Sequence, residues 1–272
     1  MICLASCNKD KDSNNGGTPG GGSQTIGAKL SAVWEEKITY REETTDGGAT
    51  WHVAETTYGD KYKKESFTWD GNKITSIRDY FDGPNYSPTY YDFMYDGEKI
   101  SEVLIDGLHL DVSYSGSKIS RIECYVGEYN DEHVVYTMSY SNNKLSKIDA
   151  EIEDDYGTDN QTMSFYWDGD NVIRMVTDGW TSRFGSYDNG NNPYLGPDAM
   201  LFFMMNNVEE FACAMSKNNC TDIDFDEGPI TYQYSYNSKN YPTQAVKNWT
   251  HASWGSNYRT RTVTTYTYEY VD

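Results

Sequence analysis

No run of apolar residues in this 272-residue sequence approaches the length of a membrane-spanning helix. Such a helix needs about 20 consecutive, mostly apolar residues. Hydrophobic residues form only 37% of the chain, and polar residues interrupt them throughout. We therefore expect no transmembrane helix, although a chain of this length can bury a sizeable core of its own.

Basic residues are also scarce. The chain has 22 Lys and Arg residues against 42 Asp and Glu residues, which gives a formal net charge of -20. Nucleic-acid binding needs a basic surface that neutralises phosphate groups, so this charge argues against it. We interpret the excess of acid as a soluble, self-repelling surface.

Cysteine and histidine are too few and too scattered to form a recognisable site. Cys124, Cys213 and Cys220 lie in the body of the chain, without paired metal-ligand spacing or a disulfide framework. The four histidines are equally dispersed: His52, His109, His133 and His251. The sequence therefore predicts no metal site and no cofactor. Buried free thiols are the favoured interpretation of the body cysteines, with pairing of Cys213 and Cys220 left open.

Signatures of catalysis are missing or misplaced. The chain has no Gly-x-Ser-x-Gly motif, phosphate-binding loop or dinucleotide fingerprint. Two Ser-x-x-Lys matches, at residues 115–118 and 141–144, lie in predicted hairpin turns, whereas that chemistry needs a helix N-terminus. The alternating acids of residues 222–228 fit an exposed strand edge better than an EF-hand. We therefore expect no enzyme, although distant carboxylates could still converge in space.

The N-terminus carries an export signature. Residues 4–7, Leu-Ala-Ser-Cys, form a lipobox, in which small residues precede the cysteine that accepts the lipid. Residues 8–28 are charged and then Gly-rich, a composition typical of a flexible tether. Because only six residues precede Cys7, we interpret residues 1–7 as the remnant of a lipoprotein signal. We predict lipidation at Cys7 and anchoring to the outer membrane of the cell envelope, with periplasmic or surface exposure left open.

An internal repeat is the strongest signal in the sequence. Each copy contains an apolar residue, an aromatic residue two positions later, a pair that favours a turn, a Lys or Asn, and two aliphatic residues spaced by three. The five clear copies are residues 67–77, 93–103, 112–122, 138–148 and 165–175, and a looser sixth copy follows at residues 234–246. A recurring unit of this length is the signature of a repeated supersecondary structure.

The repeat predicts a series of β-hairpins. Alternating apolar and aromatic residues suit the end of a half-buried strand. The pair that follows, such as Asp70 and Gly71, tolerates the positive φ angles of a tight turn. The spacing of Ile74 and Ile77 breaks strict alternation, which predicts a β-bulge. We therefore expect residues 29–272 to form one all-β domain, an up-and-down antiparallel meander curled into a partly closed, barrel-like sheet.

One segment departs from this pattern and predicts a helix at about residues 197–216. Pro197 suits the first helical position, and Asp198 suits the positive end of the helix dipole. Apolar residues then recur at the helical period: Met200, Leu201, Met204, Met205, Val208, Phe211, Ala212 and Met215. An apolar stripe of this kind needs a covering surface, and we expect the concave face of the curled sheet to provide it.

Together with the repeat, three further segments carry a resemblance to a known family. They are residues 187–196, which contain an Asn-Pro pair, residues 216–219, and residues 232–243. Over about residues 30–272, the chain resembles a family of uncharacterised bacterial envelope lipoproteins, described as a domain of unknown function with a porin-like fold. The resemblance implies a large curled antiparallel sheet with a helix inserted late in the chain, and it implies no activity.

A group of aromatic residues near the C-terminus is the candidate for ligand binding. Trp249, His251, Trp254 and Tyr258 lie in a predicted loop between two strand-like stretches. Exposed Trp and Tyr side chains stack on sugar rings and make strong contacts with protein partners. Because aromatic residues form 15% of the chain, most must pack in the core, and packing is the favoured interpretation of this group as well.

Three hypotheses of function follow. The first is a non-enzymatic binding or interaction protein tethered to the outer membrane, with a glycan or a protein as partner. The second is a carrier or sensor of an apolar ligand held between sheet and helix, which an apolar cavity beside Met200, Met204 and Phe211 would favour. The third, and least favoured, is an envelope hydrolase, which converging acids with a raised pKa would support.

Overall fold

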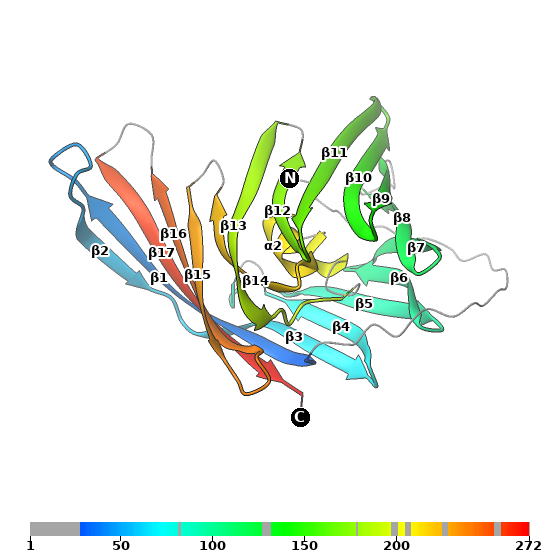
Figure 1. Cartoon of the computed structure of the whole chain (residues 1–272), viewed down its shortest axis with the longest axis horizontal. Coiled ribbons are helices and arrows are strands. Elements are labelled where there is room, and N and C mark those ends of the chain that lie inside the picture. Colours follow the sequence, from blue (N-terminus) through cyan, green and yellow to red (C-terminus); the bar gives the residue numbers. More distant parts are fainter. Residues whose placement is uncertain are drawn as a thin grey trace.

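The computed structural model of the chain is an antiparallel β structure around a short helical region (Figure 1). It describes residues 28–80, 83–126, 132–177, 179–196, 201–204, 208–224, 228–252 and 257–271. The strands belong to one sheet, and the described residues include the helix α2 (Val208–Met215). The strands are β1 (Leu30–Glu43), β2 (His52–Tyr58), β3 (Tyr62–Asp70), β4 (Lys73–Asp79), β5 (Thr89–Asp96), β6 (Lys99–Ile105), β7 (Leu108–Ser115), β8 (Lys118–Val126), β9 (Glu132–Ser141), β10 (Lys144–Asp154), β11 (Gly157–Asp168), β12 (Asn171–Thr177), β13 (Trp180–Asn191), β14 (Asn218–Asp224), β15 (Ile230–Tyr236), β16 (Pro242–Ala252) and β17 (Tyr258–Tyr270).

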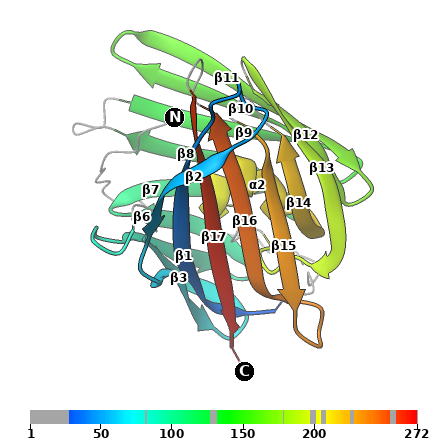
Figure 2. The same ribbon diagram turned by 90° about the vertical axis from the view of Figure 1, so that its left-hand side faces the viewer.

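The sheet closes on itself. From β3 to β17, each strand pairs antiparallel with the next strand in the sequence. β17 then pairs with one edge of β1, and β2 and β3 share the other edge of β1. Figure 2 shows β17 between β1 and β16. The predicted meander is therefore confirmed, but the sheet is a closed barrel rather than a partly closed one, because β1 joins the two ends of the meander and removes their free edges.

The two faces of the barrel differ in polarity. In β7, Leu108, Leu110 and Val112 are buried on the inner face, whereas His109 and Asp111 lie on the outer face. The neighbouring strands follow the same alternation, as β8 and β9 illustrate. The core of the protein therefore lies inside the ring of strands, and polar side chains cover its outside.

Each clear copy of the repeat folds as a hairpin, as predicted. Gly71, Gly97, Gly116 and Gly169 occupy four of the turns with positive φ angles, and Asn142 and Asn143 supply the positive φ angles of the remaining one. A register shift lies beside the turn in each of the five hairpins. The bulge predicted from the spacing of the aliphatic residues is therefore confirmed.

Successive hairpins are joined by lysine and aromatic side chains. Each lysine lies over the aromatic ring of the next hairpin, with its Nζ 4.8–5.9 Å from the ring centroid. The same Nζ donates a hydrogen bond to that hairpin's turn. The pairs are Lys29 with Trp69, Lys73 with Tyr95, Lys99 with Tyr114, Lys118 with Tyr140, and Lys144 with Trp167. We call this arrangement the lysine–aromatic ladder; it gives the aromatic anchors of the repeat a structural role around the barrel.

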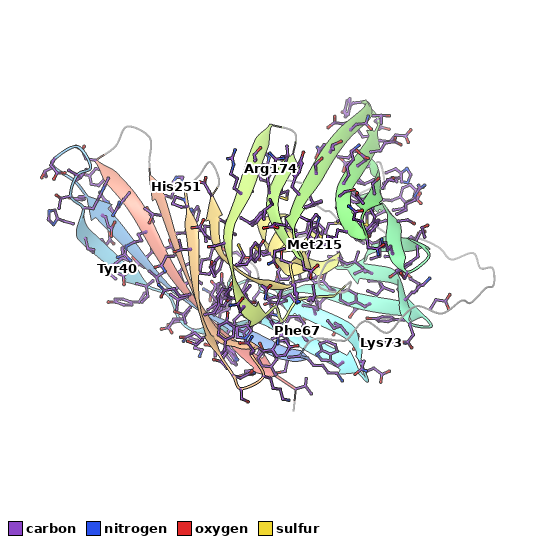
Figure 3. All side chains as sticks on the ribbon, viewed as in Figure 1. Tyr40, Phe67, Lys73, Arg174, Met215 and His251 are labelled. Carbon is purple, nitrogen blue, oxygen red and sulfur yellow. The ribbon has the colours of Figure 1, made fainter. Side chains whose placement is uncertain are left out.

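The inserted segment is helical, as predicted, at residues 201–204 and in α2; residues 197–200 and 205–207 lie outside the described part of the chain. α2 lies inside the barrel (Figures 1 and 2). Phe211 is fully buried and packs edge-on against Phe165 of β11, with 5.6 Å between ring centroids. Side chains fill the centre of the molecule around Phe67 and Met215 (Figure 3). The helix therefore covers the inner face of the sheet.

Candidate functional site

The predicted aromatic cluster does not lie in a loop. Trp249 and His251 belong to β16, and Tyr258 is the first residue of β17. The loop prediction is wrong at these positions because both strands extend further toward each other than the sequence pattern suggests. Trp254 lies outside the described residues, as does the predicted lipidation site Cys7.

The described members of the cluster also have different surroundings. The Trp249 ring packs against the core, and its Nε1 atom is buried without a hydrogen-bond acceptor among the described residues. His251 is exposed at the end of the same strand, 5.9 Å from the Trp249 ring between centroids. The Tyr258 ring lies under the guanidinium group of Arg41, at 4.6 Å. These positions indicate a structural role for Trp249 in the sheet.

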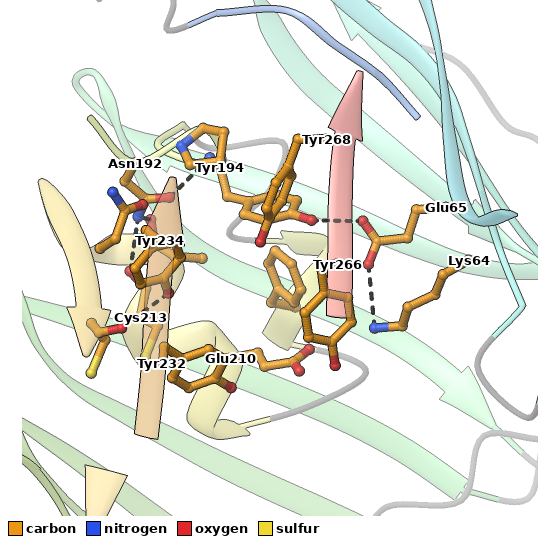
Figure 4. A pocket seen from close by; sticks show the side chains of 15 residues that line it. Lys64, Glu65, Asn192, Tyr194, Glu210, Cys213, Tyr232, Tyr234, Tyr266 and Tyr268 are labelled. Carbon is orange, nitrogen blue, oxygen red and sulfur yellow. Dashed lines mark hydrogen bonds and ion pairs between the residues drawn. The ribbon is translucent and has the colours of Figure 1, made fainter. Parts of the chain in front are cut away.

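A cavity lies instead inside the barrel, beside α2 and the inner faces of β3, β15 and β17 (Figure 4). Its volume is about 80 Å³. Three charged side chains line it, Lys64, Glu65 and Glu210, together with five tyrosines. We call it the tyrosine cavity. It lies between sheet and helix, where the apolar-carrier hypothesis expects a ligand, but its lining is aromatic and charged rather than rich in methionine.

A bulge in β3 turns two consecutive charged residues into the barrel. Val33 of β1 pairs with Glu65, whereas its neighbour Trp34 pairs with Lys63, so Lys64 is the extra residue. In a regular strand, Lys64 and Glu65 would point to opposite faces. The bulge instead brings the Lys64 ammonium group within 3.4 Å of the Glu65 carboxylate; the Glu65 side chain is buried and that of Lys64 is 11% exposed.

The register of the sheet then brings a second carboxyl group to the same place. Asp79 of β4 pairs directly with Glu65. Burial raises the pKa of Asp79 to about 7, with a further increase from the charge of Glu65. Burial likewise raises the pKa of Glu65, although the neighbouring Lys64 opposes this shift. Asp79, which faces Glu65 across paired strands, therefore retains its proton at a pH where exposed acids lose theirs.

The lysine remains charged in this environment. Burial acts to lower the pKa of Lys64, but the negative charges of Glu210 and Glu65 outweigh it and hold the pKa well above its usual value. The hydroxyl of Tyr194 donates a hydrogen bond to the other oxygen of Glu65, at 2.9 Å. One wall of the cavity is therefore an ammonium–carboxylate pair that a phenol holds in place.

Tyrosines from alternate positions of two strands form another part of the lining. Tyr232 and Tyr234 lie on β15, and Tyr266 and Tyr268 lie on β17. The strand between them, β16, places the small residue Ala245 directly between Tyr234 and Tyr266. Figure 4 shows Glu210 of α2 between the rings of Tyr232 and Tyr266.

Burial raises the pKa of all four phenols. The negative charge of Glu210 adds to the effect of burial on Tyr232 and on Tyr266, where Lys64 opposes it. The rings are therefore neutral phenols at physiological pH. They offer hydrogen-bonding hydroxyls and electron-rich faces to whatever enters the cavity.

A single asparagine fixes the end of α2 that reaches the cavity. The Nδ2 atom of Asn192 donates to the carbonyls of Cys213, Ala214 and Ser216, at 2.9, 3.2 and 2.7 Å. Carbonyls in the last turn of a helix have no partner within the helix, so this side chain acts as a cap. Asn192 belongs to the Asn-Pro segment that carries the family resemblance. In the structure, this segment therefore positions the C-terminal end of α2.

The remaining segments of the resemblance meet beside this cap. Asp188 accepts hydrogen bonds from the backbone and side chain of Asn219 and from the Tyr236 hydroxyl. A side chain at Gly190 would meet the Tyr236 ring at 2.3 Å, so the close approach requires glycine there. These segments, which are far apart in the sequence, thus form one hydrogen-bond network beside the cap of α2.

Two thiols lie beside the tyrosines. Cys213 of α2 and Cys220 of β14 line the cavity as free thiols. Their mutual hydrogen bond raises the pKa of Cys213 and lowers that of Cys220. The expected free thiols are therefore what the structure contains.

Sequence reasoning missed the charged and tyrosine residues of the cavity. Alternate tyrosines at 232 and 234, and again at 266 and 268, were a usable signal, because residues two apart on a strand share a face. The inward position of Lys64 had no such signal, since the bulge depends on pairing with β1. Asp222 and Asp224 lie on β14 with Ile223 buried between them, so the predicted strand alternation is confirmed; β14 pairs with both β13 and β15 and is therefore not an edge strand.

The described residues contain no helix with the length and apolar character needed to cross a membrane. In the same part of the chain, no group of three or more His, Cys, Asp or Glu residues is placed to hold a metal ion.

Comparison with known proteins gives the fold. No protein-family model matches the chain, and no curated protein matches it. Among solved structures, it is similar to a porin-like protein from Bacteroides uniformis, at 14% identity and a TM-score of 0.53, over 86% of this chain and 97% of that one. A porin-like protein from Bacteroides vulgatus aligns at 11% identity and a TM-score of 0.34, over 90% and 99% of the two chains. The first of these confirms the porin-like fold that the resemblance implies.

Proposed function

We propose that the protein is a non-enzymatic binding protein of the bacterial envelope that holds a small polar ligand in the tyrosine cavity. The observation that carries this proposal is the lining: five tyrosines, two glutamates and a lysine surround a space of about 80 Å³ inside an otherwise apolar core. Buried polar and charged groups destabilise a core unless they are compensated. A concave site with a few convergent polar groups is where ligand binding is expected first.

The proposed binding site lies inside the barrel and not at the aromatic cluster around Trp249. Trp249 packs against the core, so a glycan or protein partner at this position has less support than a ligand in the cavity. An apolar ligand also has less support, because buried carboxyl groups would lose hydration without gaining partners. Export and lipid anchoring through Cys7 belong to the same proposal and are supported by the lipobox and the tether.

A thermal-shift screen of the full-length protein tests the proposal, with a panel of amines, sugars, carboxylates and fatty acids. A ligand at 100 times its dissociation constant should stabilise the fold by about 2.7 kcal/mol. We expect one polar class to raise the melting temperature of the wild type and to have no such effect on Tyr232→Ala. The matched control is Tyr156→Ala, because Tyr156 is 98% exposed. If no compound acts, or if both variants respond like the wild type, the cavity is not a binding site.

A hydrolase is the second candidate, and the acids inside the barrel are the observation that favours it. The pKa values of Glu65 and Asp79 are raised by burial, as those of general acids often are. The panel is therefore also incubated with chromogenic glycosides and esters. Turnover that disappears in Glu65→Gln would replace the binding proposal with an enzymatic one.

A further inference from the structure

The two thiols beside the tyrosine cavity form a pair. Cys213 lies in the last turn of α2, and Cys220 lies on β14, beyond the turn that follows the helix. Their side chains are hydrogen-bonded to each other. A disulfide needs two Cβ atoms about 3.5–4.5 Å apart, so two cysteines whose sulfur atoms are already in contact are close to that geometry.

The surroundings of the two sulfur atoms differ. Cys220 is buried, whereas Cys213 is half-buried. The Cys220 thiol donates a hydrogen bond to the Asp222 carbonyl at 3.2 Å, and the Tyr187 hydroxyl is hydrogen-bonded to the same sulfur atom. The hydrogen bond from Cys213 lowers the pKa of Cys220, against the effect of burial. Since the thiolate is the reactive form of cysteine, Cys220 is the thiol that reacts first with an oxidant.

The volume of the cavity limits the size of that oxidant. Both thiols line the tyrosine cavity, so a reagent that occupies its 80 Å³ or so meets both sulfur atoms. One water needs about 10–15 Å³ of such space, so the cavity holds only a few molecules of that size. Hydrogen peroxide is little larger than water and fits. Glutathione disulfide, a pair of linked tripeptides, is far too large, so the cavity favours a small peroxide over a disulfide reagent.

We propose that Cys213 and Cys220 form a peroxide-reactive dithiol, which hydrogen peroxide converts to a disulfide between α2 and β14. This modification site goes beyond the proposed function, because it does not depend on which ligand the cavity binds.

The reaction has two steps. In the first, the Cys220 thiolate attacks a peroxide oxygen, the O–O bond breaks, and hydroxide leaves and takes up a proton to form water, which leaves Cys220 as a sulfenic acid. In the second, the Cys213 sulfur attacks the Cys220 sulfur, the S–O bond breaks, and hydroxide leaves with the Cys213 proton as a second water. Both thiols are oxidised and one peroxide is reduced, so no further reactant is needed.

Peptide mapping of the full-length protein tests the proposal. Trypsin cleaves after Lys217, between the two cysteines, so the disulfide links two peptides that are otherwise separate. The protein is treated with an equivalent of hydrogen peroxide, alkylated in denaturant, digested and analysed by mass spectrometry. We expect the linked peptides to appear and dithiothreitol to separate them.

Cys124 of β8 is an internal control within the same molecule. It is 2% exposed, as is Cys220, but it stands outside the described lining of the cavity. We expect its thiol to be lost at least about tenfold more slowly than that of Cys220. Absence of the linked peptides, or loss of Cys124 as fast as Cys220, would overturn the proposal.

Two variants assign the order of the steps. In Cys213→Ser, we expect dimedone to trap Cys220 as its sulfenic acid, because the second thiol is missing. In Cys220→Ser, we expect Cys213 to remain a thiol. The matched control, Cys124→Ser, should form the disulfide at the wild-type rate. If a cavity variant does not fold, dimedone added to the wild type during the reaction gives the same information. Labelling of Cys213 in place of Cys220 would overturn the assignment of Cys220 as the attacking thiol.

Discussion

The Asp79 carboxyl group illustrates how a single residue can respond to the closed fold. It is 3% exposed and stands opposite Glu65 across paired strands. Its folded-state pKa is about 7, compared with an ordinary value of 3.8. A group whose pKa is raised on folding binds its proton more tightly in the native state, so it contributes to stability at low pH and loses this contribution as the pH rises.

The variant Asp79→Asn tests this relation. The amide cannot ionise, so the free energy of unfolding of the variant, relative to that of the wild type, should increase between about pH 5 and pH 8. The shift should amount to a few kcal/mol at most, at about 1.4 kcal/mol per pKa unit. Urea denaturation at several pH values measures it, with Asp92→Asn on the exposed face of β5 as control. A constant difference between variant and wild type would show that Asp79 is ionised throughout.

Among the secondary-structure elements, the lysine–aromatic ladder links each hairpin to the next. In one step of it, the Tyr140 hydroxyl donates to the Ile119 carbonyl at 2.8 Å while the Nζ of Lys118 lies 4.8 Å from the ring centroid. We expect Tyr140→Phe to cost about 1 kcal/mol through the lost hydrogen bond, and Lys118→Met about 0.5–1 kcal/mol because the lysine is partly exposed.

A double-mutant cycle separates the cation–ring contact from the rest. Lys118→Met combined with Tyr140→Leu should give a coupling energy of about 0.5–1 kcal/mol in denaturant unfolding. Lys239→Met, at an exposed turn residue, should show no coupling with Tyr140→Leu. Zero coupling between Lys118 and Tyr140 would mean that Lys118 contributes to stability only through its hydrogen bond to the neighbouring turn.

The packing of Trp249 predicts how much β16 contributes to the free energy of unfolding. Because it packs against the core, Trp249→Ala should lower the free energy of unfolding by about 3–5 kcal/mol. His251→Ala, two residues further along the strand and exposed, should change it by about 0.5 kcal/mol or less. Near-wild-type stability of Trp249→Ala, together with loss of a partner in a pulldown, would restore the surface-binding hypothesis.

The hairpins were predictable because their determinants are local. Turn residues such as Gly71 and Asn142 have the required positive φ angles, and the spacing of three between the aliphatic residues of each repeat predicts the bulge. The inward turn of Lys64 was not predictable, because an extra residue in β3 becomes visible only when its register against β1 is known. The length of β16 was missed for a different reason: tryptophan and histidine suit both a strand and a binding loop.

Closure of the barrel is a property of the whole molecule that local patterns do not encode. It depends on β1 pairing with β17, which brings together the two ends of the described chain. The pairing is reinforced by Glu42, whose buried carboxylate accepts from Arg259 Nε at 2.6 Å and from Arg261 Nε at 2.9 Å. Burial acts to raise the pKa of Glu42, but the two guanidinium groups outweigh it and lower the pKa.

The polarity of the closed barrel bears on how it meets a membrane. Barrels that span a bilayer present an apolar band to lipid and a polar interior. Here the arrangement is reversed: Glu102, Asp111 and Glu123 follow one another across neighbouring strands, and their side chains lie on the outer face, opposite the buried core. Acids in this band would be costly to place in hydrocarbon, so the barrel wall itself argues against insertion.

We therefore predict that membrane association depends on an anchor outside the barrel, at Cys7. In the full-length precursor, Cys7→Ala should move the protein from the detergent phase to the aqueous phase of a detergent-partition assay and abolish incorporation of labelled fatty acid. Cys3→Ala is the matched control, because it removes a neighbouring thiol and leaves the lipobox cysteine intact. One acyl chain gives only marginal attachment, so several chains on one cysteine are needed for stable anchoring. Membrane association of Cys7→Ala equal to that of Cys3→Ala would refute lipidation at Cys7, and the polar outer face would then require a protein partner at the membrane.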